Sequence, residues 1–280
     1  MEEYIVAGIV TYNPDLDRLR ENIESISSQV KKVIVFDNGS KNQERIKEEY
    51  QDRIILIPSS ENIGIAAALN HLMQKSKELG ATWMLSLDQD SVCSKFFCVA
   101  MSKYLKQGTD FGIVAPVIVD RNVGVVGHNP QNEYMSVRTC ITSGAFTKIE
   151  VWQKIGGYDE SMFIDSVDFE FCYRVRKAGY KVIQVRDVQL LHEIGKSEKR
   201  RLLFWTVDVK NHSAFRKYYI AQNNVYYPLK HKLWLHFIRG NIRNINQLFV
   251  IFLFENNKIE KMRNTIAGWK NAFAMYNSIK

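Results

Sequence analysis

The sequence predicts an α/β fold with a mostly parallel central sheet, and three observations support this prediction. Short runs of β-branched and apolar residues alternate with amphipathic stretches over the first 110 residues. The apolar runs are continuous, as expected of strands that are buried on both faces. Polar clusters follow three of these runs, where strands of such a sheet would end.

The elements of this alternation follow one another in order. Strands are predicted at residues 4–10, 33–36, 53–57 and 83–87, where β-favouring residues gather. Helices are predicted between them. In the first helix four apolar side chains share one face, and in the third a glycine follows the last turn. The helical ranges are 15–28, 43–50 and 65–79.

Beyond residue 110 the alternation is looser. Residues 113–119 and 139–148 are predicted as strands around a glycine-containing loop at 124–127. A helix at 167–177 ends before Gly179, and a strand follows at 181–185. We therefore expect a domain at 1–195, made of the halves 1–110 and 111–195.

The last part of the chain differs in charge. Residues 1–195 carry 22 Lys and Arg against 26 Asp and Glu, whereas residues 196–280 carry 16 against 4. We expect 196–280 to be a helical, basic and aromatic extension that contacts an anionic membrane surface or a second copy of the chain. A solvated basic helix is the plain alternative, and nucleic acid is disfavoured because no nucleic-acid module accompanies the charge.

The ends of the chain and its cysteines add little to the functional picture. The start has no basic segment before its apolar run, which argues against a secretion signal. The longest purely apolar stretch, 248–254, is much shorter than the roughly 20 residues of a spanning helix. The four cysteines form no CxxC pair, and we expect free thiols and a cytoplasmic protein.

Three polar clusters are expected at one edge of the sheet, where ligands of open α/β sheets bind. Asp88 and Asp90 follow the fourth strand, and side chains one residue apart on an extended strand point the same way. They could share Mg²⁺ or Mn²⁺, which would neutralise a diphosphate. An acidic turn is the alternative. The clusters are Thr11-Tyr12-Asn13, Asp37-Asn38-Gly39-Ser40 and Asp88-Gln89-Asp90.

Two other features of the first half could contact a nucleotide. Asp37 follows a strand and could accept a hydrogen bond from N3–H of uracil or thymine, although Asp beside Asn-Gly is also a common turn residue. Asn62 and Gly64 precede a helix that starts with three alanines and reaches Asn70. A helix N-terminus of this kind favours phosphate, and a tight packing face is the alternative.

An acidic cluster in the second half could supply a general base. The cluster comprises Asp159, Asp165, Asp168 and Glu170, and Asp168 opens the predicted helix, where the helix dipole favours an ionised carboxylate. Ordinary helix capping is the alternative. His192 follows a strand and could bind a metal or a phosphate oxygen, or be a structural histidine.

Taken together, these motifs resemble the inverting family-2 glycosyltransferases of GT-A fold, a Rossmann-like arrangement. The Asp-Gln-Asp and Phe-Ile-Asp-Ser-Val-Asp motifs look most like the bacterial rhamnosyltransferase branch. The resemblance covers residues 4–195 well and the extension loosely. Its further motifs are 10–14, 37–40, 62–70, 143–146 and 156–160.

The resemblance implies roles for these residues. Asp37 would read a pyrimidine base with Thr11 and Asn13 beside it. Asp90 would bind the metal directly, and Asp88 the metal or the ribose. Asp168 would be the base, whereas His192 would lie near the diphosphate. The remaining expected nucleotide-sugar contacts are Tyr12, Asn38, Asn62, Gly64, Asn70 and Gln89.

The sequence departs from the family pattern at two positions. Val167 replaces the usual Glu before Asp168, so Asp165 either shares the base role or orients the acceptor. Gln222 stands where Arg often precedes Asn223, while His212, Ser213 and Arg216 look like the rhamnosyltransferase pattern.

The implied activity is transfer of L-rhamnose from dTDP-rhamnose to a hydroxyl of a growing, lipid-linked surface polysaccharide. Such an enzyme would work at the inner face of the cell membrane. A UDP-hexose donor such as UDP-glucose or UDP-galactose is the nearest alternative. A sugar nucleotidyltransferase would need a glycine-rich phosphate loop after the first strand, which residues 11–14 do not offer. A non-enzymatic membrane- or nucleic-acid-binding module is the third reading.

Overall fold

The structure, a computed structural model, describes residues 3–50, 53–120, 124–191, 198–202 and 205–278. The chain divides into two compact units. The first comprises Met1–Ser161 and Val167–Glu193, and the second comprises Met162–Ser166 and Ile194–Lys280. The domain boundary after residue 195 stays a prediction, and the assignment of 162–166 to the second unit was not part of it.

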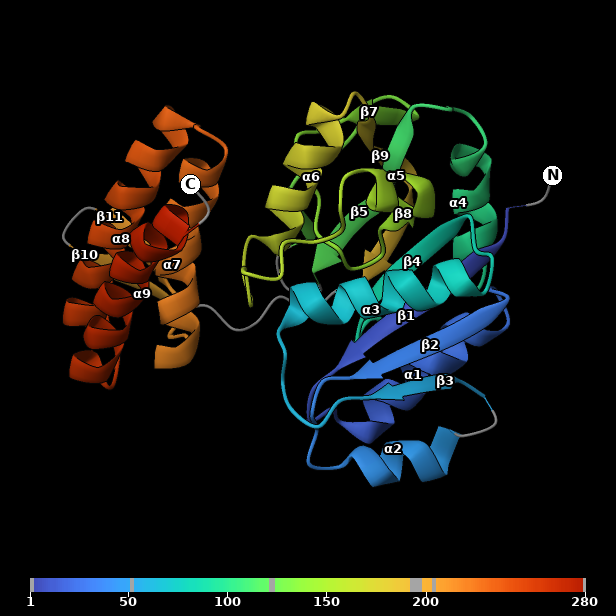
Figure 1. The fold of residues 1–280 in the computed structure, drawn as a ribbon, viewed down its shortest axis with the longest axis horizontal. Helices are drawn as coiled ribbons and strands as arrows, with labels where there is room; N and C mark the ends of the chain where they lie inside the picture. The colour runs from blue at the N-terminus through green and yellow to red at the C-terminus, as the bar shows by residue number, and fades with distance from the viewer. Residues whose placement is uncertain (1–2, 51–52, 121–123, 192–197, 203–204, 279–280) are drawn as a thin grey trace. The chain divides into compact units, whose positions relative to one another are not determined.

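The first unit is built on one mixed sheet, coloured from blue to olive in Figure 1. Its strand order is β3-β2-β1-β4-β8-β5-β9-β7, with β6 beside β5. The strands are β1 Ile5–Thr11, β2 Lys32–Asp37, β3 Ile55–Pro58, β4 Trp83–Asp88, β5 Phe111–Asp120, β6 Gly124–Val126, β7 Tyr134–Ser136, β8 Phe146–Lys148 and β9 Lys181–Leu191.

The sheet is parallel in one half only. β1 pairs in parallel with β2 and β4, and β2 with β3. β8 runs antiparallel to both β4 and β5, although β5 and β9 are again parallel. The prediction of a mostly parallel sheet therefore describes β3-β2-β1-β4, and the part beyond β4 is mixed.

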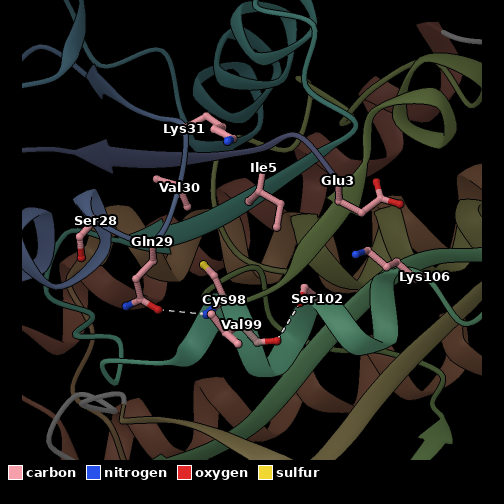
Figure 2. A pocket seen from close by; sticks show the side chains of 10 residues that line it. All are labelled: Glu3, Ile5, Ser28, Gln29, Val30, Lys31, Cys98, Val99, Ser102 and Lys106. Atoms are coloured by element: carbon pink, nitrogen blue, oxygen red, sulfur yellow. Dashed lines mark hydrogen bonds between the residues drawn. The ribbon is translucent and has the colours of Figure 1, made fainter. Parts of the chain in front are cut away.

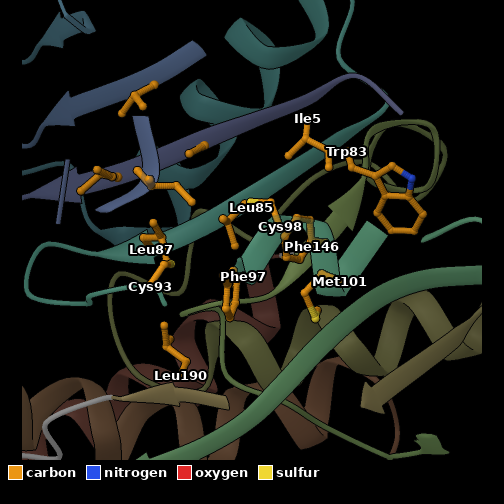
Figure 3. Close-up of a cluster of buried hydrophobic side chains, with 14 of the residues drawn as sticks. Ile5, Trp83, Leu85, Leu87, Cys93, Phe97, Cys98, Met101, Phe146 and Leu190 are labelled. Carbon is orange, nitrogen blue, oxygen red and sulfur yellow. The ribbon is translucent and has the colours of Figure 1, made fainter. Parts of the chain in front are cut away.

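Helices cover both faces of this sheet. Ile5, Ala7 and Ile9 of β1 belong to a buried cluster that also contains apolar residues of α1, α2 and α4, part of which Figure 3 shows. On the other face α3 packs against β1, where a Cβ at Gly8 would lie 3.1 Å from Leu72 Cδ1. The helices are α1 Leu16–Ser27, α2 Gln43–Tyr50, α3 Ile65–Glu78, α4 Phe97–Leu105, α5 Ile149–Lys154 and α6 Val167–Lys177.

Beyond β4 the first unit departs from the sequence prediction in several places. The strand predicted at 139–148 is wrong for 139–145, because Gly144 has φ +78° and a turn from Thr142 to Ala145 leaves only β8 in the sheet. The loop predicted at 124–127 is also wrong in part, because residues 124–126 pair with β5 as β6. The helices α4 and α5 were not predicted.

The described residues of the second unit form a small sheet and three helices. The extension begins with a two-stranded antiparallel sheet, β10 Glu198–Leu202 and β11 Trp205–Val209, so the expected helical extension starts only at α7. The helices are α7 Ala214–Lys230, α8 Trp234–Phe254 and α9 Lys258–Ser278.

Among the residues that the structure describes, no helix combines the length and apolar character required to cross a membrane.

A buried ionic cluster joins the three helices of the second unit. Glu255, which caps α8, accepts from Lys217 of α7 at 2.6 Å and from Lys261 of α9 at 2.9 Å. Lys261 also donates to Asn211 Oδ1 at 2.6 Å. All three charged side chains are at most 6% exposed, so this cluster depends on every partner being present.

Candidate active site

The polar ends of three neighbouring strands meet at one edge of the sheet. Thr11 of β1 is paired with Asp37 of β2, and Val10 with Asp88 of β4. These strands are parallel, so their carboxyl ends lie on the same side. The three clusters predicted to converge are therefore brought together, at the edge where ligands of open α/β sheets bind.

Asp37 is buried at this edge and surrounded by donors. Its Oδ1 accepts from the Thr11 hydroxyl at 3.0 Å and from the Ser40 hydroxyl. Its Oδ2 accepts from the Ser40 N–H at 3.1 Å and from Gln43 Nε2 at 2.7 Å. Four hydrogen bonds match the capacity of a carboxylate, so these neighbours can hold the buried ionised form.

Two loops next to Asp37 are tied together by side chains that the sequence singled out. Asn13 has φ +46°, its N–H donates to Ser40 Oγ at 2.8 Å, and its Oδ1 accepts from the Lys41 N–H at 2.9 Å. The Tyr12 N–H donates to Gln89 Oε1 at 2.9 Å, and its ring is 49% exposed. Asn13 and Gln89 thus shape the loops, whereas Tyr12 offers an accessible ring.

The loop after β2 also makes a close contact with the start of α3. Asn38 is buried, and its Oδ1 accepts from the Ile63 N–H at 2.8 Å. Gly39 has φ +80°, and a Cβ there would lie 2.5 Å from the Glu61 carbonyl carbon. Asn62 accepts from the Gly64 N–H at 3.0 Å, which forms the turn that begins α3. Only glycine allows this approach at residue 39.

Asn70 has a structural role that the sequence did not reveal. Its Oδ1 accepts from Trp152 Nε1 at 3.0 Å and from the Tyr158 N–H at 2.7 Å. Its Nδ2 donates to the Tyr158 carbonyl at 3.0 Å and to Glu160 at 2.8 Å. These four bonds use the capacity of the amide to join α3 to the loop after α5. Contact between Asn70 and a nucleotide sugar stays a prediction.

The Asp88-Gln89-Asp90 motif begins at the end of β4 and continues into a turn. The Ser91 N–H donates to the Asp88 carbonyl at 3.1 Å, which closes this turn. The expectation that both carboxylates lie on extended strand is therefore wrong, since the strand ends at Asp88. Both Asp side chains are partly exposed at the sheet edge.

This acidic turn could still hold a divalent cation. The described part of the chain contains no group of three or more His, Cys, Asp and Glu side chains suited to a metal. Mg²⁺, however, is usually bound through one or two carboxylates together with substrate phosphates. The two aspartates fit a cation that arrives with a diphosphate. His192, the third expected ligand, lies outside the described residues.

Three polar residues support the acidic turn, and none of them was predicted as a site residue, although Ser143 lies in a motif of the family resemblance. Asn22 of α1 donates to the Asp88 carbonyl at 2.6 Å, and Ser143 Oγ accepts from the Asp88 N–H at 3.4 Å. The Ser143 and Ser91 hydroxyls are 2.7 Å apart. A signal existed for Asn22, because it interrupts the apolar face of α1 and is fully buried.

The predicted base, Asp168, lies in the first turn of α6 in the first unit. Its Oδ1 accepts from the Phe169 N–H at 2.9 Å, and its side chain is partly exposed. The positive end of the helix dipole favours the ionised carboxylate at this position, which is the form a base requires.

Asp165, the second predicted acid, belongs to the second unit. Arg216 of α7 donates to both of its oxygens, from Nη2 at 2.8 Å and from Nε at 3.0 Å. Asn223 of α7 donates to the Ile164 and Asp165 carbonyls, both at 2.8 Å. The carboxylate also raises the pKa of Arg216. A carboxylate held by two charge-assisted bonds is suited to positioning rather than to proton transfer.

A cavity of about 290 Å³ lies at the opposite end of β1 from the clusters (Figure 2). It is lined by Ile5 at the amino end of β1, by Gln29 and Lys31 before β2, and by Ser102 and Lys106 around the end of α4. Because ligands of open α/β sheets bind at the carboxyl ends of strands, we do not assign the site to this cavity.

Comparisons with known proteins agree with this geometry. The model of glycosyl transferase family 2 matches residues 7–167. The dTDP-rhamnosyl transferase RfbF of Shigella flexneri is 30% identical over 95% of this chain and 94% of its own length.

Two solved structures share the fold. TarS of S. aureus, residues 1–349 in complex with UDP-GlcNAc, has a TM-score of 0.61 at 13% identity and covers 97% of this chain and 80% of its own. The mannosyltransferase PcManGT from Pyrobaculum calidifontis, in complex with GDP-Man and Mn²⁺, has a TM-score of 0.57 at 14% identity, with 98% and 76% covered. These likenesses show a GT-A fold.

The family match spans more than half of the chain, and the likeness to RfbF spans nearly all of it. The strand-end clusters fall within the matched region. This chain therefore belongs to glycosyl transferase family 2 and is a glycosyltransferase of the hexosyltransferase class.

Proposed function

We propose that this enzyme transfers L-rhamnose from dTDP-rhamnose to a hydroxyl of a growing, lipid-linked surface polysaccharide. The observation that carries the proposal is the 30% identity with a dTDP-rhamnosyl transferase over nearly the full length of both chains. Transfer would be a single displacement with inversion at the anomeric carbon, as implied by the family resemblance.

The donor nucleotide would lie along the carboxyl ends of β1, β2 and β4. In this proposal Asp37 accepts the N3–H of thymine, and the Tyr12 ring is free to stack on the base. Four protein donors already bind the Asp37 carboxylate, so one of them must move before the base can bind. Gln43 or the Ser40 hydroxyl must turn away as the base arrives, because the carboxylate has no further lone pair to offer.

Asp90 and Asp88 would hold Mg²⁺ or Mn²⁺ together with the diphosphate of the donor. A cation there would supply stabilisation of the negative charge that grows on the departing diphosphate. The Mn²⁺ in the mannosyltransferase complex is a property of that protein and is consistent with this proposal. Asn22 and Ser143 would fix the turn on which both aspartates depend.

Asp168 would remove the proton from the acceptor hydroxyl, and Asp165 would position the segment that precedes it. The bidentate bond with Arg216 favours this division of roles, because a proton taken up by Asp165 would neutralise the carboxylate that the Arg216 guanidinium pairs with. Asp168 lies in the first turn of α6, where the helix dipole favours the ionised carboxylate that a base requires.

A donor screen tests this function. The protein is incubated with dTDP-rhamnose, UDP-glucose, UDP-galactose or UDP-GlcNAc, with and without Mg²⁺ or Mn²⁺, and donor hydrolysis is measured. We expect metal-dependent hydrolysis with dTDP-rhamnose, no hydrolysis with EDTA, and loss of activity in Asp90→Asn and Asp168→Asn at unchanged melting temperature. Faster hydrolysis of a UDP-hexose would replace the donor assignment, and full activity in either variant would overturn the residue roles.

A further inference from the structure

The helices α8 and α9 bury mostly polar or small residues, whereas α7 also buries Val225, Tyr226 and Leu229. On α8 the buried residues are Gly240, Asn244 and Ile251. Asn244 donates to the Ala221 carbonyl of α7 at 2.9 Å and accepts from Asn224 at 2.9 Å. Helices in water usually bury their large apolar side chains instead, so the buried faces of α8 and α9 are unusual for solvated helices.

Two glycines bring the helix backbones together in the same way. A Cβ at Gly240 of α8 would lie 1.9 Å from the Asn224 carbonyl oxygen of α7. A Cβ at Gly268 of α9 would lie 2.0 Å from the Tyr218 carbonyl oxygen of α7. Close backbone approach at small residues, reinforced by hydrogen bonds between polar side chains, is the packing used by helices in an apolar solvent.

Six large apolar side chains of α8 are exposed. They form a stripe with spacings of three and four residues, which places them on one face of the helix. Each is between 50% and 70% exposed. We call this set the α8 stripe; it consists of Leu235, Ile238, Ile242, Ile245, Phe249 and Phe252. With a rise of about 1.5 Å per residue it is about 26 Å long.

Basic groups border the α8 stripe. Arg239 and Arg243 are exposed on one side of it, and Lys258 Nζ lies 5.9 Å from the centre of the Phe252 ring. On α9, Ile259 and Ile266 are 78% and 40% exposed. Exposed apolar groups with cations at their rim match the interface of a bilayer, where long basic side chains reach the headgroups.

The charge of the second unit favours one kind of partner for this surface. Residues 214–278 contain ten Lys and Arg against two Asp and Glu, and α8 contains no acid. One of the two acids, Glu255, is buried in its ion pairs. A second copy would oppose like charges along the stripe, whereas an anionic bilayer offers both apolar depth and negative charge.

We propose that the α8 stripe lies in the headgroup region of an anionic membrane, with Arg239 and Arg243 on its lipid phosphates. This goes beyond the proposed function, since it concerns a surface of the second unit and needs neither the donor nor the acceptor assignment. A bilayer contact on α8 would keep the enzyme beside an acceptor that is confined to the same membrane.

Vesicle co-sedimentation of the full chain tests this proposal. Vesicles contain phosphatidylcholine alone or phosphatidylcholine and phosphatidylglycerol in equal parts. We expect binding to the mixed vesicles only, weakened by salt. The double variant Ile242→Gln, Phe249→Gln should bind at least roughly tenfold more weakly, because two anchors no longer partition into the interface.

Two further variants serve as controls. Phe96→Gln with Val99→Gln removes two residues that are 66% and 67% exposed in the first unit, and should leave vesicle binding unchanged. Arg239→Gln with Arg243→Gln should weaken binding to the mixed vesicles and remove much of its salt dependence. Circular-dichroism melting checks that each variant is folded.

Three results would overturn the proposal. The first is failure of the wild-type protein to bind the mixed vesicles. The second is binding of the stripe variant as tight as that of the wild type. The third is a wild-type dimer in light scattering that becomes a monomer in the stripe variant while vesicle binding stays unchanged. That result would assign the α8 stripe to contact with a second copy.

Discussion

The contact between the loop after β2 and the start of α3 makes a quantitative prediction at Gly39. An alanine there would keep φ +80° and place a Cβ 2.5 Å from the Glu61 carbonyl carbon. The left-handed conformation costs an L-residue about 1–2 kcal/mol. Forcing two packed loops apart adds about 1–3 kcal/mol. We therefore expect Gly39→Ala to lower the free energy of unfolding by about 2–5 kcal/mol.

The chain offers a matched control for this substitution. Gly80 has φ +79°, and a Cβ there would meet no atom within 4 Å. Gly80→Ala should therefore carry the conformational cost alone, about 1–2 kcal/mol. Urea unfolding of both variants measures the difference, which isolates the effect of the close approach.

The same pair of variants tests the position of the site. Gly39 lies between Asp37 and Ser40, so separating its loop from α3 should displace the groups that surround Asp37. Calorimetric titration with dTDP should show affinity at least roughly tenfold lower for Gly39→Ala and near wild type for Gly80→Ala. Equal stability costs would refute the close approach, and equal dTDP affinities would refute its link to nucleotide binding.

Three further outcomes concern other parts of the molecule. Asp165→Asn should lower the free energy of unfolding by about 1–2 kcal/mol, because its bonds to Arg216 weaken. This variant should keep the shape of the pH–rate profile, whereas Asp168→Asn should show no transfer at any pH. An altered profile in Asp165→Asn would instead make it a base. Glu255→Gln should cost about 3–5 kcal/mol in urea unfolding, since two buried lysines lose their counter-ion; a cost below about 1 kcal/mol would contradict that. Burial, with Arg216 nearby, lowers the pKa of His212 from 6.5 to about 4. The unfolded chain therefore binds more protons between these values, and stability should fall as pH drops from 6.5 to about 4. His212→Gln should flatten this dependence.

The parallel half of the sheet was predictable because each of its elements carries a local pattern. β1 is a continuous apolar run, α1 has its apolar residues on one face, and the acidic motif marks the end of β4. By contrast, β7 and β8 are three residues each, too short for a period to register. Their place in the sheet depends on pairing with distant strands, which a single sequence does not display.

The candidate site divides in the same way. The strand-end positions of Thr11, Asp37 and Asp88 follow from the alternation, and the register of β1 with its neighbours brings them together. The partners of Asn70 were not foreseeable, because Tyr158 and Glu160 lie 88 and 90 residues away. Nor could the sequence indicate that Arg216, 51 residues away, forms an ion pair with Asp165.

The assignment of residues 162–166 to the second unit has a consequence for protein engineering. The chain enters that unit at Met162 and returns at Val167, with Asp165 and Ser166 both at positive φ. A truncation after residue 195 would leave these five residues in place but would remove Arg216 and Asn223, which hold them. A catalytic portion cut there should therefore lose the contacts that hold residues 162–166, and exchanging extensions between related enzymes should require exchanging that segment as well.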